Sequence, residues 1–269
     1  MAGARHDSPS GLETEIAGIQ WWHSIDLGGG VVTPGTKTAE WHAEELRRLA
    51  LPDLAGRSVL DVGAWDGFYA FHAERAGAAR VVALDHLAWG GRIPDLQASW
   101  EERRPDGPTA FVFEEDPRWD PVGLPGRAGF DLAHRMLDSR VEPAVLDVSR
   151  DDLEPLGRFD VILFLGVLYH LRDPLAVLRR LAALCDDMIV IETEAVAIGG
   201  HPDAAAIEFL GTEDRKLNGD PTNWWSPTAA GLLALCERAG FARAEIVGRP
   251  PVPRAGRRYR YRAVAHAWR

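Results

Sequence analysis

Short apolar runs alternate with longer segments of helical periodicity along most of this chain. Runs that are apolar on both faces are typical of the central strands of a parallel sheet. Such strands are predicted at 58–62, 80–85, the end of 141–147, 159–166 and 188–194, with two final strands at 242–248 and 258–268. The intervening helices are expected over 38–50, 67–77, 128–138, 173–185 and 226–241.

Capping residues support several of these helices. Thr38 precedes the first helix, whose Trp41, Glu45 and Leu49 recur at helical spacing. Asp173 and Pro174 are suited to the N-cap and first helical position of the fourth helix. In the last helix, Ser226 is the expected cap, Pro227 the first helical residue and Gly240 the end.

This alternation predicts an α/β fold in which a mostly parallel sheet has helices on both faces. Right-handed crossovers would place the carboxyl ends of the strands along one edge, where ligands bind. We expect an N-terminal helical lid or substrate segment over 1–50, frayed to about residue 15, and a ligand-binding domain over 51–269. Residues 101–127 resemble an insertion, and 195–225 a long loop.

Composition narrows the class of protein. No run approaches the length of a membrane span, and the N-terminus lacks the apolar core of a signal peptide, so a cytoplasmic location is expected. Cys185 and Cys236 are expected to be reduced core residues. The formal net charge of −10 disfavours nucleic acid as a partner, although the tail 249–262 is basic.

The stretch VLDVGAWDGFYA (59–70) predicts a strand that turns through glycines into a helix. Neither GxGxxG nor a Walker A lysine is present. Trp65 and Asp66 in this turn suit a cationic, diol-bearing ligand such as S-adenosylmethionine better than a phosphate, or the turn merely joins strand to helix. Asp85 ends the next strand about 20 residues later, the usual place for a ribose-binding carboxylate.

Two further strand ends fit the same ligand. Asp147 could accept the adenine amino group, and the carbonyls near Leu165 and Gly166 could meet an ammonium. The blocks WWHSIDLGGGVVTPG, LDVGAWDGFYAF, FLGVLYHLRDPL and LNGDPTNWWSP then resemble the tRNA 5-methoxyuridine-34 methyltransferase-like family of class I S-adenosylmethionine-dependent methyltransferases, over about 16–265.

The resemblance implies a Rossmann-like, seven-stranded sheet with the last strand antiparallel. It also implies a set of cofactor contacts: Asp61, Gly63, Trp65, Gly67, Asp85, Asp147, Val148 and Leu165. One branch of the family uses a carboxylated cofactor, whose extra carboxylate would meet Lys37, Tyr169 and Arg262 here. The form of the cofactor therefore stays open between the two.

Methyl transfer from a sulfonium depends largely on positioning, with a base where an oxygen or nitrogen must lose a proton. His170, beside Tyr169, is the candidate base or a helix-start histidine bonded to backbone. His86 is a candidate at the adenine. Candidates for the substrate pocket are Trp22, His23, His201, Trp224 and Trp225, each with packing as its alternative, and Arg262.

Glu192 and Glu194 fall on one side of their strand; we expect solvated strand-end acids, with binding of substrate or a metal by one of them as the alternative. No spacing demands a metal, and none is expected. Three functions remain: methylation of an oxygen or nitrogen of a small metabolite, as in secondary-metabolite biosynthesis; (carboxy)methylation of a tRNA wobble uridine; and a catalytically silent binding domain. We favour the first, with a homo-oligomer left open.

Overall fold

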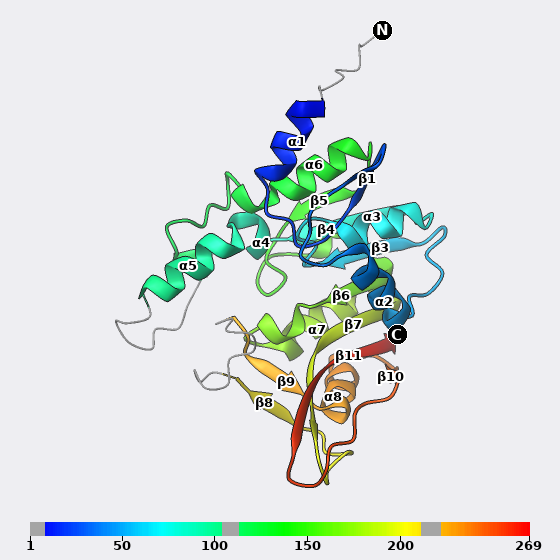
Figure 1. Cartoon of the computed structure of the whole chain (residues 1–269). Coiled ribbons are helices and arrows are strands. Elements are labelled where there is room, and N and C mark those ends of the chain that lie inside the picture. Colours follow the sequence, from blue (N-terminus) through cyan, green and yellow to red (C-terminus); the bar gives the residue numbers. More distant parts are fainter. Residues whose placement is uncertain (1–8, 104–112, 211–221) are drawn as a thin grey trace.

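The computed structural model describes residues 9–103, 113–210 and 222–269. Its centre is a seven-stranded sheet in the order β10-β11-β7-β6-β3-β4-β5 (Figure 1). The strands are β3 (Ser58–Val62), β4 (Arg80–Asp85), β5 (Glu142–Val145), β6 (Phe159–Leu165), β7 (Cys185–Ile198), β10 (Arg243–Val247) and β11 (Arg258–Trp268). Only β11 runs antiparallel to its neighbours, as predicted.

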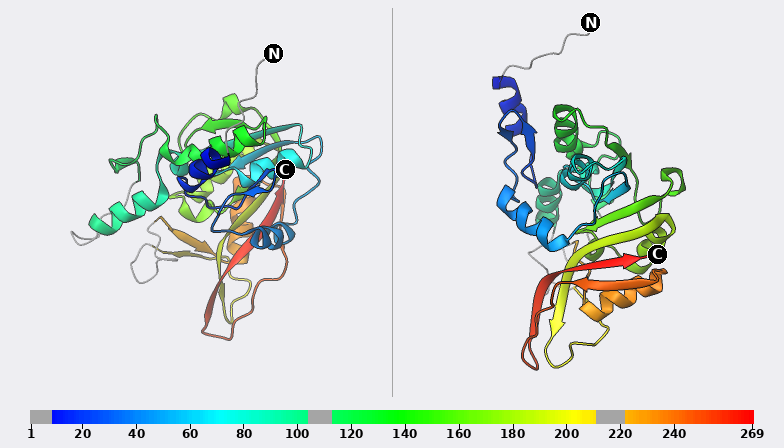
Figure 2. Two further views of the ribbon diagram at one scale, coloured as in Figure 1. Left: turned by 45° about the horizontal axis from the view of Figure 1, so that its top comes forward. Right: turned by 90° about the vertical axis from the view of Figure 1, so that its right-hand side faces the viewer.

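Helices cover both faces of this sheet (Figures 1 and 2). The helices are α1 (Pro9–Ala17), α2 (Ala39–Leu49), α3 (Phe68–Arg75), α4 (Leu87–Gly90), α5 (Ile93–Arg103), α6 (Ala128–Met136), α7 (Pro174–Leu184) and α8 (Ala229–Ala239). Alternation along the strands divides the apolar side chains between two cores. One core packs against α7 and α8, and the other against α2, α3 and α6.

The capping predictions are confirmed except at α8. Thr38 and Asp173 accept hydrogen bonds from the backbone as N-caps, and Gly240 ends α8 in the left-handed conformation. At α8 the cap is Thr228 rather than Ser226, because 225–227 pair as a strand. Of the three residues at helical spacing in α2, Glu45 and Leu49 are buried but Trp41 is exposed, and His42 is buried instead.

The predicted loop over 195–225 contains three strand segments. β7 continues to Ile198 because β11 pairs with it throughout, from Trp268↔Met188 to Arg258↔Ile198. β8 (Ile207–Phe209) and β9 (Trp225–Pro227) form a small antiparallel hairpin. The loop prediction was therefore wrong for these residues. In Figures 1 and 2 the β7–β11 ribbon projects beyond the parallel strands.

The N-terminal part also differs from its prediction. Residues 9–15 belong to α1, whereas 16–35 hold a small hairpin of β1 (Asp26–Gly28) and β2 (Val31–Val32). The expected insertion over 101–127 is partly occupied by the end of α5 and by the 3-10 turns η2 (Phe113–Glu115) and η3 (Pro125–Arg127). We call residues 19–38 the lid segment, because it lies over the turn that follows β3.

Close backbone packing shapes the lid segment at Gly35. A Cβ atom on Gly35 would lie 2.0 Å from the carbonyl carbon of His23. The chain before β1 and the chain after β2 approach each other there, with Ser24 N donating to Lys37 O at 2.9 Å. Only glycine permits that approach, so Gly35 fixes the path of the chain past the site.

We expect Gly35→Ala to destabilise the protein by about 1–3 kcal/mol, because the backbone must move to remove the clash. Gly18→Ala is the matched control, since a Cβ there would lie 3.5 Å from its nearest neighbour. Thermal unfolding of both variants checks this. A Gly35→Ala midpoint equal to that of Gly18→Ala would contradict it.

Candidate functional site

The turn between β3 and α3 is the first element of the site. Gly63 and Gly67 have φ angles of 80° and 87°, and Trp65 between them has φ 49°, which is unusual for a bulky residue. Its backbone N–H donates to Asp85 Oδ2 at 2.9 Å, and its carbonyl accepts from the Trp89 indole. These bonds hold Trp65 in a conformation that costs about 1–3 kcal/mol.

Asp85 at the end of β4 is committed to this turn through both oxygens. Oδ1 accepts from the Ala88 N–H at 2.9 Å, beside the bond of Oδ2 to Trp65. The side chain is buried, and burial raises its pKa. Asp85 therefore shapes the turn as well as lying where a ribose is expected.

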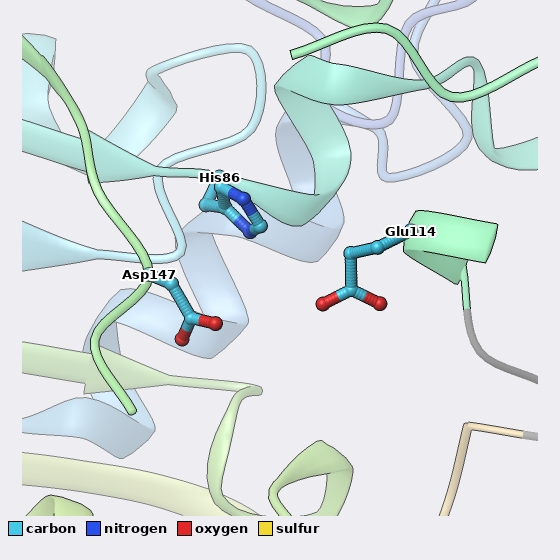
Figure 3. A group of neighbouring side chains, drawn as sticks. All are labelled: His86, Glu114 and Asp147. Carbon is cyan, nitrogen blue, oxygen red and sulfur yellow. The ribbon is translucent and has the colours of Figure 1, made fainter. Parts of the chain in front are cut away.

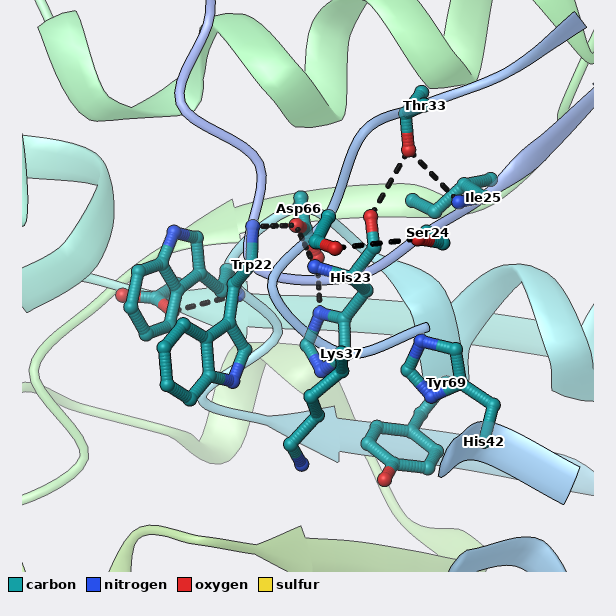
Figure 4. Close-up of polar contacts among 12 residues, drawn as sticks. Trp22, His23, Ser24, Ile25, Thr33, Lys37, His42, Asp66 and Tyr69 are labelled. Carbon is teal, nitrogen blue, oxygen red and sulfur yellow. Dashed lines mark hydrogen bonds and ion pairs between the residues drawn. The ribbon is translucent and has the colours of Figure 1, made fainter. Parts of the chain in front are cut away.

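Asp66 joins the turn to the lid segment (Figure 4). Its Oδ2 accepts the backbone N–H groups of Trp22 at 2.9 Å and His23 at 2.8 Å, and its Oδ1 forms a short contact with His23 Nδ1. Asp66 and His23 are both buried. One carboxylate thus fixes two successive lid residues over the turn.

Aromatic rings reinforce this closure. Trp22 stacks on Trp65 with ring centroids 5.1 Å apart and planes at 3°. Phe68 stacks against both His23 and His42, with ring centroids 5.5 and 3.7 Å apart, and the two histidine rings are themselves 5.2 Å apart. Burial lowers the pKa of His42 to about 4, so this ring is neutral near pH 7 and packs as an aromatic group.

At the ends of β4 and β5, His86, Asp147 and Glu114 point toward one another (Figure 3). Their ligand atoms lie within 4.8 Å, which makes a three-residue cluster able to hold a metal. The Arg150 guanidinium already lies among them, with Nε 3.0 Å from Asp147 and Nη2 3.4 Å from His86 Nε2. A positive group of the chain thus neutralises the acids, and the expected lack of a metal stays a prediction.

The loop after β6 brings four predicted residues together. The 3-10 turn η5 (Leu168–His170) carries Tyr169 and His170, whose rings are 4.2 Å apart. His170 Nδ1 is 2.7 Å from the Thr222 hydroxyl. Trp224 donates its backbone N–H to Tyr169 O at 2.7 Å, and the Trp225 indole donates to Leu171 O at 2.8 Å.

A chain of ion pairs crosses the same edge. Arg262 donates two hydrogen bonds to Glu192, which also accepts from Arg48 of α2 at 3.2 Å. The Arg262 guanidinium lies 4.9 Å from the centre of the Tyr169 ring. Lys37 donates to both oxygens of Glu45, at 2.8 and 3.0 Å. Lys37 and Arg262, predicted from the sequence, are therefore each paired with a carboxylate.

The prediction that Glu192 and Glu194 are solvated was wrong. Both are buried: β11 continues beside β7 past the end of β6, and Glu192 there pairs with Arg262 of β11 and Arg48 of α2. The remaining predicted residues lie apart from these contacts or in the core: His201 is exposed after β7, and Val148 is buried.

Sequence reasoning gave no site role to Glu45, Arg48 or Arg150, and read Asp66 only as part of the turn. One signal was available for Glu45, a charged residue at helical spacing with Leu49.

Asp61 in β3 is 2% exposed, and burial together with Asp85 and Asp66 raises its pKa to about 7.

The shifted pKa of Asp61 makes stability depend on pH. Between its ordinary value of 3.8 and about 7 the folded state holds a proton that the unfolded chain releases, so this contribution to stability is lost as the pH rises through that range. As the pH rises from 5 to 8, we expect the midpoint of thermal unfolding to fall less in Asp61→Asn than in the parent. Glu44→Gln, at an exposed site on α2, is the control. Equal losses in all three proteins would contradict this assignment.

We expect Asp66→Ala to release the lid segment. Three contacts of a buried carboxylate are lost, so amide hydrogen exchange over 19–38 should rise about tenfold or more while exchange in β6 stays unchanged. Asp26→Ala, which removes only a hydrogen bond to Gly28 N in the exposed hairpin, is the control. A parallel rise in β6 would show that Asp66 holds the whole domain instead.

A family model described as a methyltransferase domain matches residues 38–245. The tRNA U34 carboxymethyltransferase of Marinobacter nauticus is 28% identical over 252 residues, covering 91% of this chain and 62% of the relative. That of Idiomarina loihiensis is 26% identical over 216 residues, covering 77% and 53%. The chain spans little more than half the length of these relatives.

Solved structures share the fold. The N-terminal domain of EvdMO1 with SAH bound superimposes with a TM-score of 0.59 at 18% identity, covering 100% of both chains. The same domain in the presence of SAH and D-fucose gives 0.57 at 16%, covering 99% of both. No helix in the described part of the chain is long and apolar enough to cross a membrane. By the family model that matches most of its length, this chain belongs to the methyltransferase domain family.

Proposed function

We propose that the chain methylates an oxygen or nitrogen of a small metabolite, as in secondary-metabolite biosynthesis, and that it uses S-adenosylmethionine without an added carboxyl group. One observation carries the choice of cofactor. The cations at the carboxyl edge, Lys37, Arg48 and Arg262, are each already paired with Glu45 or Glu192. An added carboxylate would have to compete with these buried acids.

The donor set fits the unmodified cofactor. Carboxylates follow β4 and β5 at Asp85 and Asp147, and an indole stands in the first turn at Trp65, which suits a diol, an amine and a cation. When bound, the cofactor supplies the methyl group on a sulfonium. The chain orients it through the Gly63–Gly67 turn, and Trp22 with its neighbours in the lid segment excludes water above that turn.

The substrate would lie against Tyr169, His170 and Trp224. Aromatic walls with a few polar groups are typical of pockets for small organic molecules. The chain's net charge of −10 also favours a neutral or cationic acceptor over a polyanion. The structural neighbour studied with D-fucose offers a precedent for a hydroxyl-rich small molecule beside this fold.

A specific feature supports the alternative, a tRNA wobble uridine. After Glu245 the chain contains no acidic residue but seven arginines, of which Arg249, Arg254 and Arg257 precede or begin the exposed end of β11. The curated relatives named above also carry the name of tRNA enzymes. A radiolabelled methyl-transfer assay on unmodified tRNA, beside a panel of hydroxylated and aminated metabolites, separates the two readings.

We expect the purified protein to retain S-adenosylmethionine or its demethylated product in native mass spectrometry, with no mass that carries an extra carboxyl group. In calorimetry the carboxylated cofactor should bind at least tenfold more weakly than S-adenosylmethionine. Glu192→Gln should reduce this difference in affinity between the two cofactors, because Arg262 then loses its charged partner. Glu142→Gln, whose residue pairs with Arg80 at the opposite end of the sheet, should leave the difference unchanged. Tighter binding of the carboxylated form by the parent would overturn the choice.

A further inference from the structure

Glu194 lies beyond the carboxyl edge of the parallel strands. β6 ends at Leu165, which is in register with Glu192 of β7. Glu194 is two residues further along, directly opposite Arg262 of β11. Because side chains alternate along a strand, Glu194 faces the same side as Glu192, the side that Arg48 of α2 reaches.

Glu194 is mostly buried, but its carboxylate oxygens are not fully enclosed by protein atoms. Its side chain is 7% exposed, and its nearest cation is Arg262, with Nη1 at 4.0 Å from Oε2. No hydrogen-bond donor from the described residues reaches either oxygen. A carboxylate that the chain leaves without a donor, and whose oxygens are not fully enclosed, is open to a hydrogen bond with a substrate or with water.

The neighbouring acids differ from Glu194 in the number of hydrogen bonds that they accept. Glu192 accepts three hydrogen bonds from Arg262 and Arg48, and Glu45 accepts three from Lys37 and Tyr69. The cations near Glu194 are committed elsewhere: Arg262 to Glu192, and Arg260 to Glu208 at 2.7 Å. Of these three acids, Glu194 is thus the one that accepts no side-chain hydrogen bond from the described residues.

We propose that Glu194 is the general base that takes the proton from the substrate's hydroxyl or amine during methyl transfer. The proposal rests on the function proposed above. Glu194 is placed beside Arg262, whose guanidinium lies against Tyr169, at the end of the strand where the methyl donor is expected. A pair of carboxylates with different surroundings commonly divides in this way, one staying charged and one accepting protons.

The step balances without another reactant. The substrate oxygen or nitrogen attacks the methyl carbon, the carbon–sulfur bond breaks, and its electron pair neutralises the sulfonium. The proton of the nucleophile passes to the Glu194 carboxylate and then to water. The products are the methylated acceptor, S-adenosylhomocysteine and one proton.

The charges around Glu194 tune its affinity for a proton. Burial and Glu192 raise its pKa, and Arg262 and Arg260 lower it, with burial the largest effect. A carboxylate with a raised pKa is a stronger base while it remains ionised, which favours activity on the alkaline side of its titration.

Glu194→Gln tests the proposal because glutamine keeps the size but cannot take the proton. We expect kcat for an acceptor found in the metabolite panel to fall about 10²-fold or more, with the acidic limb of the pH profile removed. Calorimetric affinity for S-adenosylhomocysteine should change less than about twofold. Acceptors that are already ionised should lose the least activity. Glu142→Gln is the control, since it lies at the opposite end of the sheet.

Infrared spectroscopy tests Glu194 without any acceptor. The parent should show a carboxylic acid band that persists above the range of an ordinary glutamate and is missing from Glu194→Gln. If the parent and Glu194→Gln show the same infrared spectrum in this region, the proposal is overturned. It is also overturned if kcat is unchanged in Glu194→Gln but is lost in His170→Ala. If the parent methylates no small molecule, the proposed function fails, and the infrared difference still decides whether Glu194 holds protons as described.

Discussion

The continuous pairing of β7 with β11 is the constraint on which the site depends. These strands remain hydrogen-bonded past the point where β6 and β3 end, so the sheet carries a ribbon above its own ligand-binding edge. Side chains that would otherwise be exposed to solvent are buried between that ribbon and α2. The charges of Glu192, Glu194 and Arg262 are therefore fixed by secondary structure and need no flexible loop to position them.

Burying so many charges is unfavourable unless each has a partner, because water no longer solvates them. The chain meets this requirement by drawing partners from three separate elements: Lys37 from the lid segment, Arg48 from α2 and Arg262 from β11. The same pairs hold these elements against one another. The proposed preference for the unmodified cofactor rests on these same pairs, since removing one acid changes both the packing of these elements and the charge that a ligand would meet.

Much of the sheet could be predicted because its central strands are apolar on both faces and each is followed by a recognisable turn. The acids at the strand ends were identified for the same reason: Asp85 ends one apolar run and Asp147 follows another, and the end of each run is easy to locate in the sequence. The polar environment of Glu192 and Glu194 could not be predicted, because a strand-end acid is normally solvated and nothing local to it shows that a partner strand 70 residues away continues further. The role of Asp66 in holding the lid segment was equally hidden, since its partners Trp22 and His23 are more than 40 residues distant.

The attachment of the lid segment has an evolutionary consequence. Trp22 and His23 are held by a side chain of the first turn, so the part of the molecule that would meet the substrate is anchored to the part that would hold the cofactor. The segment cannot be exchanged between relatives as an independent module: a transplanted lid would need its own matching acid and indole in the turn. Diversification of substrate in such chains is then expected to proceed through paired changes in two distant stretches of sequence, and inheritance of one stretch alone would leave a domain that folds but does not close.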